Sequence, residues 1–187
     1  MSAQLVGYAD AYREAQRLVH EVAADLSDEA FNWKPDAKSW SVGESIVHLN
    51  TMAEGYLPVL ERAAQSDGPR ANGPFRYGFV ARTFTNAVRP GSRPIPTAGS
   101  MKPPAATGRR SEIDKAQALE RFDADTERYT AAVEQADGLD LSRISVRSPF
   151  LKLLKLPLGA FFDALGQHAI RHAQQAQRVT QQPGFPA

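Results

Sequence analysis

LGAFFDALGQHAIRHAQQAQRV, residues 158–179, has an apolar residue at nearly every third or fourth position, and Pro183 lies just beyond it. This spacing matches the period of an α-helix and predicts a helix with one apolar face. The face includes one histidine among its members, which are Leu158, Phe162, Leu165, Ala169, His172, Ala176 and Val179. Because such a helix must bury its apolar face against other elements, the segment predicts a packed helical fold.

Three further segments carry an apolar stripe of the same period. The first stripe consists of Leu5, Tyr8, Tyr12, Ala15, Val19, Val22 and Leu26. The second consists of Ile46, Leu49, Ala53, Tyr56, Leu60 and Ala63. The third consists of Leu119, Phe122, Thr126, Tyr129, Val133 and Ala136. Four helices, each with one apolar face, predict an all-α four-helix bundle.

The sequence also marks where these helices begin and bend. Ser41 and Glu44 fit a capping box at the start of the second helix, and Pro58 predicts a kink within it. The third helix is expected to begin at Ser111, with acidic residues in its first turn. Strand signals are weak and are limited to residues 143–146.

Residues 67–110 form a long basic crossover between the second and third helices. They contain seven of the 13 prolines and six of the 13 glycines, and positions 68–111 hold eight basic residues and no acidic one. A connection of this length is uncommon in a compact domain and can cross the whole bundle. We therefore expect the second and third helices to run parallel within one domain, residues 1–187. A short helix is expected within residues 74–88, from the spacing of Phe75, Phe79, Thr83 and Val88.

Composition narrows the classes of function. The absence of cysteine excludes disulfides, thiolate ligands and a cysteine nucleophile, and a net charge of +1 points to no nucleic-acid or membrane partner. The N-terminus lacks the features of a signal peptide, and no apolar run approaches the roughly 20 residues that span a bilayer. We expect a cytoplasmic protein. No Walker loop, H-E-x-x-H, G-x-S-x-G or dinucleotide-binding motif is present.

Histidines provide the strongest candidate site. His168 and His172 are one helical turn apart, so both imidazoles can reach one ion at about 2.0–2.1 Å. His48 flanks the apolar stripe of the second helix at the same relative depth and is a natural third ligand. The alternative is three separate histidines, each hydrogen-bonded or partly exposed. His20 lies about 100° from the stripe of its helix and is expected to be solvated.

Two short motifs resemble those of the DinB-like (YfiT-like) superfamily. The motif W-S-x-x-E-x-x-x-H-L at the start of the second helix is matched by Trp40, Ser41, Glu44, His48 and Leu49. The motif H-x-x-x-H-x-x-Q on the last helix is matched by His168, His172 and Gln175. Helix order and the long crossover also fit, so the resemblance covers nearly the whole chain. It implies a DinB-like four-helix bundle in which His48, His168 and His172 hold one divalent ion.

The resemblance implies a class of activity as well. Characterised members of this superfamily are thiol S-transferases or thiol-dependent isomerases, and many others are labelled hydrolases. A metal-dependent thiol S-transferase or hydrolase acting on a small molecule is therefore expected. A non-catalytic, stress-related binding or interaction module is the alternative. Three imidazoles leave coordination positions open, and they do not choose the metal. Zinc or nickel is expected, with iron, copper and manganese left open.

Two polar residues of the motifs each have two interpretations. Glu44, one turn before His48, either orients that imidazole or acts as a general base, or it only completes the capping box. Gln175, one turn after His172, either hydrogen-bonds a bound water or substrate or is a polar residue near the end of the bundle.

The basic crossover has three interpretations, which concern Arg76, Arg82, Arg89 and Arg93. These side chains bind a carboxylate or phosphate of the substrate, such as the carboxylates of a low-molecular-weight thiol, or they lie solvated on an irregular segment. Nucleic-acid binding is disfavoured by the overall charge. A small molecule is the expected partner, and a homodimer is left open.

Overall fold

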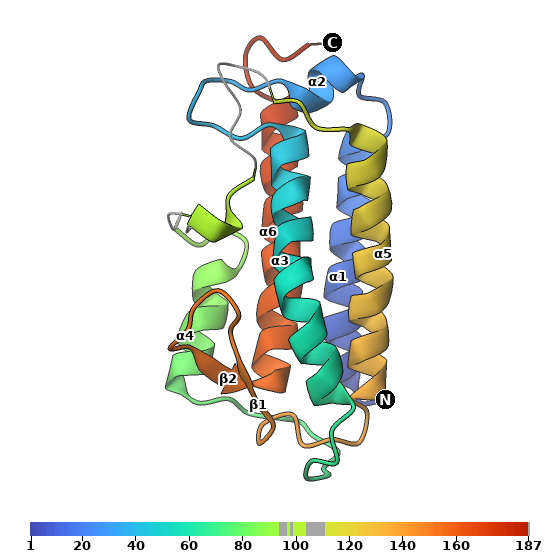
Figure 1. The fold of residues 1–187 in the computed structure, drawn as a ribbon, viewed down its shortest axis with the longest axis vertical. Helices are drawn as coiled ribbons and strands as arrows, with labels where there is room; N and C mark the ends of the chain where they lie inside the picture. The colour runs from blue at the N-terminus through green and yellow to red at the C-terminus, as the bar shows by residue number, and fades with distance from the viewer. Residues whose placement is uncertain (94–96, 98, 104–110, 187) are drawn as a thin grey trace.

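The computed structural model describes residues 1–93, 97, 99–103 and 111–186. Its main feature is a bundle of four long helices that share one apolar core (Figure 1). The bundle helices are α1 (Ala3–Ala23), α3 (Val42–Ala64), α5 (Lys115–Gln135) and α6 (Leu158–Thr180). The predicted all-α four-helix bundle is thereby confirmed. The parts of the crossover at 94–96, 98 and 104–110 lie outside the described residues.

Helices α3 and α5 run in the same direction, as the long crossover predicts. Ser41, before α3, has its Oγ 2.8 Å from the Oγ of Ser111, just ahead of α5. At the opposite end of the bundle, Gln65 donates a hydrogen bond to Gln135 at 3.1 Å. The chain therefore has to return along the length of the bundle between them. Figure 1 shows α1 and α6 running the other way.

Shorter elements surround the two ends and one side of the bundle. They are α2 (Asp28–Asn32), α4 (Phe79–Val88), the 3-10 turn η1 (Gly99–Met101), β1 (Ser145–Arg147) and β2 (Lys155–Pro157). The strands form an antiparallel hairpin in which Val146 lies opposite Leu156. The weak strand signal at 143–146 overlaps β1, whereas β2 and α2 had no predicted counterpart. No helix in the described ranges is both long and apolar enough to cross a membrane.

Aromatic side chains from three helices fill the middle of the core. The ring of Tyr12 stacks on that of Tyr129 with centroids 4.1 Å apart. Tyr129 in turn packs edge-on against Phe162 and donates its hydroxyl to the carbonyl of that residue. Burial of these rings removes large apolar areas from water, and the hydroxyl keeps a partner. The apolar stripes thus meet where the helical period predicts.

Two predicted helix boundaries are wrong. The first helix ends at Ala23, before Leu26, and the third begins at Lys115 rather than at Ser111. Asp114 is the N-cap because its carboxylate accepts the N–H of Gln117 at 2.9 Å. Ser111 has both its backbone and its hydroxyl engaged with the α2 region instead, a tertiary contact that no local signal reveals.

The crossover contains the short helix expected within residues 74–88, but other residues than those used to predict it are buried. A helix forms within residues 74–88, but Phe79 is 75% exposed, and the buried residues of α4 are Ala81 and Thr85. The helix packs on α6. The ring centroid of Phe84 lies 6.1 Å from that of Phe161 at this contact, whereas Phe79 is left on the outer face.

Gly159, in the first turn of α6, is expected to tolerate no side chain. A Cβ atom there would lie 1.9 Å from the Oη of Tyr77, which is hydrogen-bonded to the Oη of Tyr8 at 2.8 Å. Gly159→Ala should therefore lower the free energy of unfolding by about 1–3 kcal/mol. Gly7→Ala in α1 is the control, because no heavy atom lies within 4 Å of its added Cβ. It should raise stability by up to about 1 kcal/mol. Urea unfolding measures both, and a stabilised Gly159→Ala would contradict the packing described.

Candidate metal centre

Three histidines converge between α3 and α6. His48 lies in the second turn of α3, and His168 and His172 lie one turn apart on α6. Each imidazole offers a nitrogen that lies within 4.8 Å of those of the other two. The Nε2 atoms of His48 and His168 are 3.1 Å apart. The antiparallel packing of α3 on α6 therefore brings together residues that are 120 positions apart in the sequence.

A backbone carbonyl orients His48. Its Nδ1 lies 2.6 Å from the carbonyl oxygen of Met101, at the end of η1. Because a carbonyl can only accept a hydrogen bond, Nδ1 carries the proton and Nε2 presents its lone pair to His168. Sequence reasoning missed this contact, since a backbone carbonyl has no sequence signature.

All three imidazoles are held in the neutral form. Burial lowers the pKa of His48, although its hydrogen bond to Met101 opposes the shift. Burial lowers the pKa of His168 to about 3, with smaller contributions from His48 and the positive charge of Arg171. Burial and the neighbouring imidazoles also lower the pKa of His172, against a smaller opposite effect of Gln175. Neutral imidazole is the form that binds metal ions, so no proton has to leave at pH 7.

The cluster fits a divalent cation. Among the described residues, the Nδ1 atoms of His168 and His172 are buried without a hydrogen-bond partner. These two imidazoles therefore lack the hydrogen bond at Nδ1 that a purely structural buried histidine usually makes, and His168 faces His48 through its Nε2. Tetrahedral coordination at 2.0–2.1 Å places ligand nitrogens about 3.3 Å apart, close to the Nε2–Nε2 distance of 3.1 Å seen here. The donor set and the spacing therefore suit one ion.

Trp40 forms an aromatic wall beside the cluster. Its ring lies nearly parallel to that of His172, with centroids 5.7 Å apart, and its centroid is 5.0 Å from that of His48. The indole is half-buried. It therefore covers one side of the imidazoles and restricts the access of water from that side.

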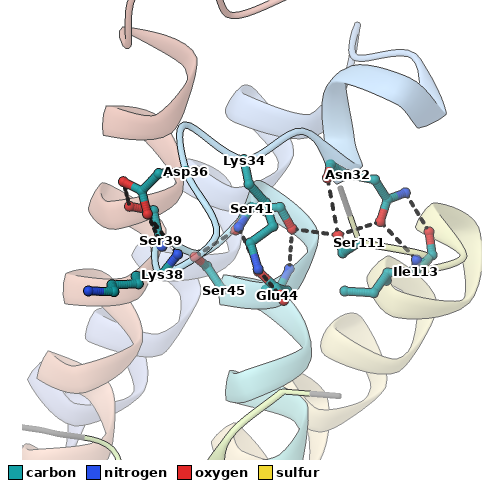
Figure 2. Close-up of polar contacts among 10 residues, drawn as sticks. All are labelled: Asn32, Lys34, Asp36, Lys38, Ser39, Ser41, Glu44, Ser45, Ser111 and Ile113. Atoms are coloured by element: carbon teal, nitrogen blue, oxygen red, sulfur yellow. Dashed lines mark hydrogen bonds and ion pairs between the residues drawn. The ribbon is translucent and has the colours of Figure 1, made fainter. Parts of the chain in front are cut away.

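Glu44 lies one turn before His48 and completes the predicted capping box (Figure 2). The N–H of Ser41 donates to its carboxylate at 2.9 Å, and its own N–H donates to the Oγ of Ser41 at 2.9 Å. The buried ammonium of Lys34 lies 3.2 Å from the same carboxylate. The partner that orients His48 is the Met101 carbonyl. Lys34, which the sequence analysis did not single out, gives Glu44 a charged partner.

A buried hydrogen-bond network ties the start of α5 to the start of α3, beside this pair (Figure 2). The Oγ of Ser111 donates to the Oδ1 of Asn32 at 2.7 Å, and the N–H of Ile113 donates to the same oxygen at 2.8 Å. The Oγ of Ser111 also meets that of Ser41. The C-terminal end of the crossover is thereby attached close to the turn that precedes His48.

Both the sequence and the fold of the chain match those of known proteins. Residues 11–176 match the sequence model of the DinB superfamily. The chain belongs to the DinB superfamily. Its structure is also similar to that of YfiT from Bacillus subtilis, described as a probable metal-dependent hydrolase with an unusual four-helix bundle topology. That alignment has a TM-score of 0.63 and 12% identity, and it covers 100% of this chain and 91% of the other. At this identity the likeness concerns the fold alone. A comparison with curated proteins gave no match.

The remaining candidates of this DinB superfamily member lie outside the three-histidine cluster. His20 is 46% exposed on its side chain, as expected, and its Nε2 lies 2.7 Å from the carboxylate of Asp123. The four crossover arginines, Arg76, Arg82, Arg89 and Arg93, are all exposed. The guanidinium of Arg89 forms an ion pair with Asp163 at 3.1 Å. These positions favour the interpretation of solvated arginines over that of a preformed anion site.

Proposed function

We propose that this protein is a metal-dependent hydrolase of a small molecule, with His48, His168 and His172 as the ligands of one divalent ion. The observation that carries the proposal is the convergence of three neutral imidazoles, with one nitrogen of each within 4.8 Å of the others. No other group of three or more potential ligands clusters in the described ranges. The description of YfiT as a probable metal-dependent hydrolase agrees with this choice.

The donor set favours chemistry with an anionic nucleophile. None of the three ligands is a carboxylate or a thiolate, so a bound ion keeps its full positive charge. Such an ion supplies Lewis acidity and lowers the pKa of a bound water or thiol towards about 7. Trp40 limits water on one side. The side chain of Gln175 interacts with the imidazole of His172, and we propose that it also hydrogen-bonds the substrate. Zinc or nickel is the expected metal, because both accept imidazole ligands.

Thiol S-transfer is the second candidate reaction. The same uncompensated charge that favours hydroxide also favours a thiolate, so the ligand set accommodates a low-molecular-weight thiol as the nucleophile. Metal-replete protein should be assayed first with esters and amides alone, and then with small thiols in the presence of electrophilic acceptors. Turnover of an ester or amide without thiol supports hydrolysis, whereas strict thiol dependence supports transfer. Failure of all of these substrates would favour the non-catalytic binding module.

Trp40 is expected to report metal binding directly. The chain has two tryptophans, so Trp33→Phe leaves Trp40 as the only one. The ring centroid of Trp40 lies 5.0 Å from that of His48 and 5.7 Å from that of His172. One equivalent of Ni²⁺ or Co²⁺ bound at these imidazoles should therefore quench its fluorescence. Trp40→Phe is the matched control, since Trp33 packs against Phe185 instead. Metal content of protein purified without a histidine tag provides an independent measurement. No saturable quenching and no bound metal would contradict the proposed site.

A further inference from the structure

Arg171 stands between His168 and His172 in α6, but its guanidinium binds the crossover. It donates to the carbonyls of Ala87 and Arg93 at 3.2 Å, and to that of Arg89 at 3.4 Å. It also donates to the Oγ of Ser92. Four acceptors within residues 87–93 therefore accept hydrogen bonds from this single side chain.

These contacts cap the C-terminal end of α4. The last carbonyls of a helix have no donor within the helix, and Ala87 lies at this end of α4. The Oγ of Ser92 assists by donating to the carbonyls of Ala87 and Arg89 at 2.7 and 2.8 Å. A guanidinium has five N–H donors spread over three nitrogens in a rigid plane, so two of its nitrogens reach acceptors on both sides of residue 92 at once. An ammonium has three donors on one nitrogen and cannot span the same set of acceptors.

The same crossover reaches the cluster a few residues later. Met101, eight positions after Arg93, places its carbonyl on the Nδ1 of His48. The crossover is therefore attached to both helices that carry the imidazoles. It is held to α6 through Arg171 and to α3 through His48.

We propose that Arg171 is a positioning residue of the metal centre. By holding residues 87–93 against α6, it keeps the Met101 carbonyl on His48 and so keeps the Nε2 of His48 directed at the cluster. This inference rests on the proposed function. The charge of Arg171 acts in the opposite direction, since a cation beside the cluster repels a second cation. The two effects therefore predict opposite changes in metal affinity.

The dissociation constant for Zn²⁺, measured by competition with a chromophoric chelator, separates the two effects. Arg171→Lys keeps the charge and loses the planar donor set, whereas Arg171→Met loses both. We expect Arg171→Lys to bind Zn²⁺ about 10-fold more weakly, the lower end of what removing the hydrogen-bond partner of a metal ligand costs. Arg171→Met should also bind Zn²⁺ more weakly, but by a smaller factor, because it loses the repelling charge as well. Arg178→Met is the matched control. This arginine is exposed, seven positions further along the same face of α6, and its substitution should leave affinity unchanged. Tighter binding by Arg171→Met would overturn the proposal.

A second variant leaves α6 unchanged, and a second measurement is made without metal. Ser92→Ala removes one acceptor of Arg171 outside the bundle core and should weaken Zn²⁺ binding in the same direction. In metal-free protein, hydrogen exchange of the backbone amides within residues 87–93 should be faster in Ser92→Ala and in both Arg171 variants. If the wild-type protein binds no Zn²⁺, the proposed function fails, and this inference fails with it. If the wild type binds Zn²⁺ and the variants bind it equally well, only the role of Arg171 is overturned.

Discussion

His172→Ala is expected to weaken Zn²⁺ binding by more than about 100-fold. This loss exceeds the roughly 10–100-fold cost of removing a residue that only hydrogen-bonds a metal ligand. The reason is that two imidazoles remain where three converge, and His172 contributes one of the nitrogens that lie within 4.8 Å of one another. Wild-type protein should gain stability on saturation with the ion, by about 4 kcal/mol at 1,000 times the dissociation constant. Thermal unfolding with and without Zn²⁺ measures this gain. At the same Zn²⁺ concentration, His172→Ala should show no more than about a third of it, because a site about 100-fold weaker is filled at only about 10 times its dissociation constant.

His20→Ala is the control for this prediction. His20 is exposed on α1 and pairs with Asp123, so its removal should change neither the Zn²⁺ stoichiometry nor the thermal gain. His48→Ala and His168→Ala should behave like His172→Ala, because each removes one ligand. Undiminished Zn²⁺ binding by His172→Ala would exclude the three-histidine site, whatever the activity of the protein.

Glu44→Gln is expected to lower the free energy of unfolding by about 3–5 kcal/mol, the cost of leaving one charge of a buried pair without its partner. Lys34 and Glu44 are 4% and 2% exposed, and the ammonium lies 3.2 Å from the carboxylate. The cap itself should survive, since glutamine can also accept the N–H of Ser41. If Glu44 only completed the capping box, this substitution would be expected to cost little. The buried ammonium is what changes that expectation.

The double variant Glu44→Gln/Lys34→Met identifies the cause, because it removes both charges and keeps the cap. We expect it to regain most of the lost stability in urea unfolding at pH 7. Glu21→Gln is the matched control, since Glu21 pairs with Arg17 on the exposed surface of α1, and such pairs contribute about 0–1 kcal/mol. A destabilisation of Glu44→Gln no larger than that of Glu21→Gln would show that the buried pair is energetically unimportant.

The same double variant gives the proper background for the catalytic question about Glu44. If Glu44 acts as a general base or orients a metal ligand, neutralising its carboxylate should lower turnover or metal affinity roughly 10–100-fold. Activity of the folded double variant equal to that of the wild type would remove Glu44 from the mechanism. The three-histidine site would be unaffected by that result.

The sequence by itself determined the features that depend on neighbours along the chain. Apolar residues of helical period predicted the four bundle helices, and Ser41 with Glu44 predicted the cap of α3. The spacing of His168 and His172 placed both on one helical face. The length of residues 67–110 predicted the parallel arrangement of α3 and α5. These signals are readable because a helix repeats every 3.6 residues and is capped by residues three positions away.

Tertiary structure alone decided the contacts between distant segments. The carbonyl of Met101 meets His48 from 53 positions away, and backbone carbonyls are the same in every residue. Lys34 reads as an ordinary surface lysine until the fold buries it against Glu44. Ser111 has the residue type of a helix N-cap, yet it hydrogen-bonds Asn32 across 79 positions. Each of these groups satisfies its hydrogen-bonding capacity with whatever the packing brings near, because a buried polar group without a partner is costly.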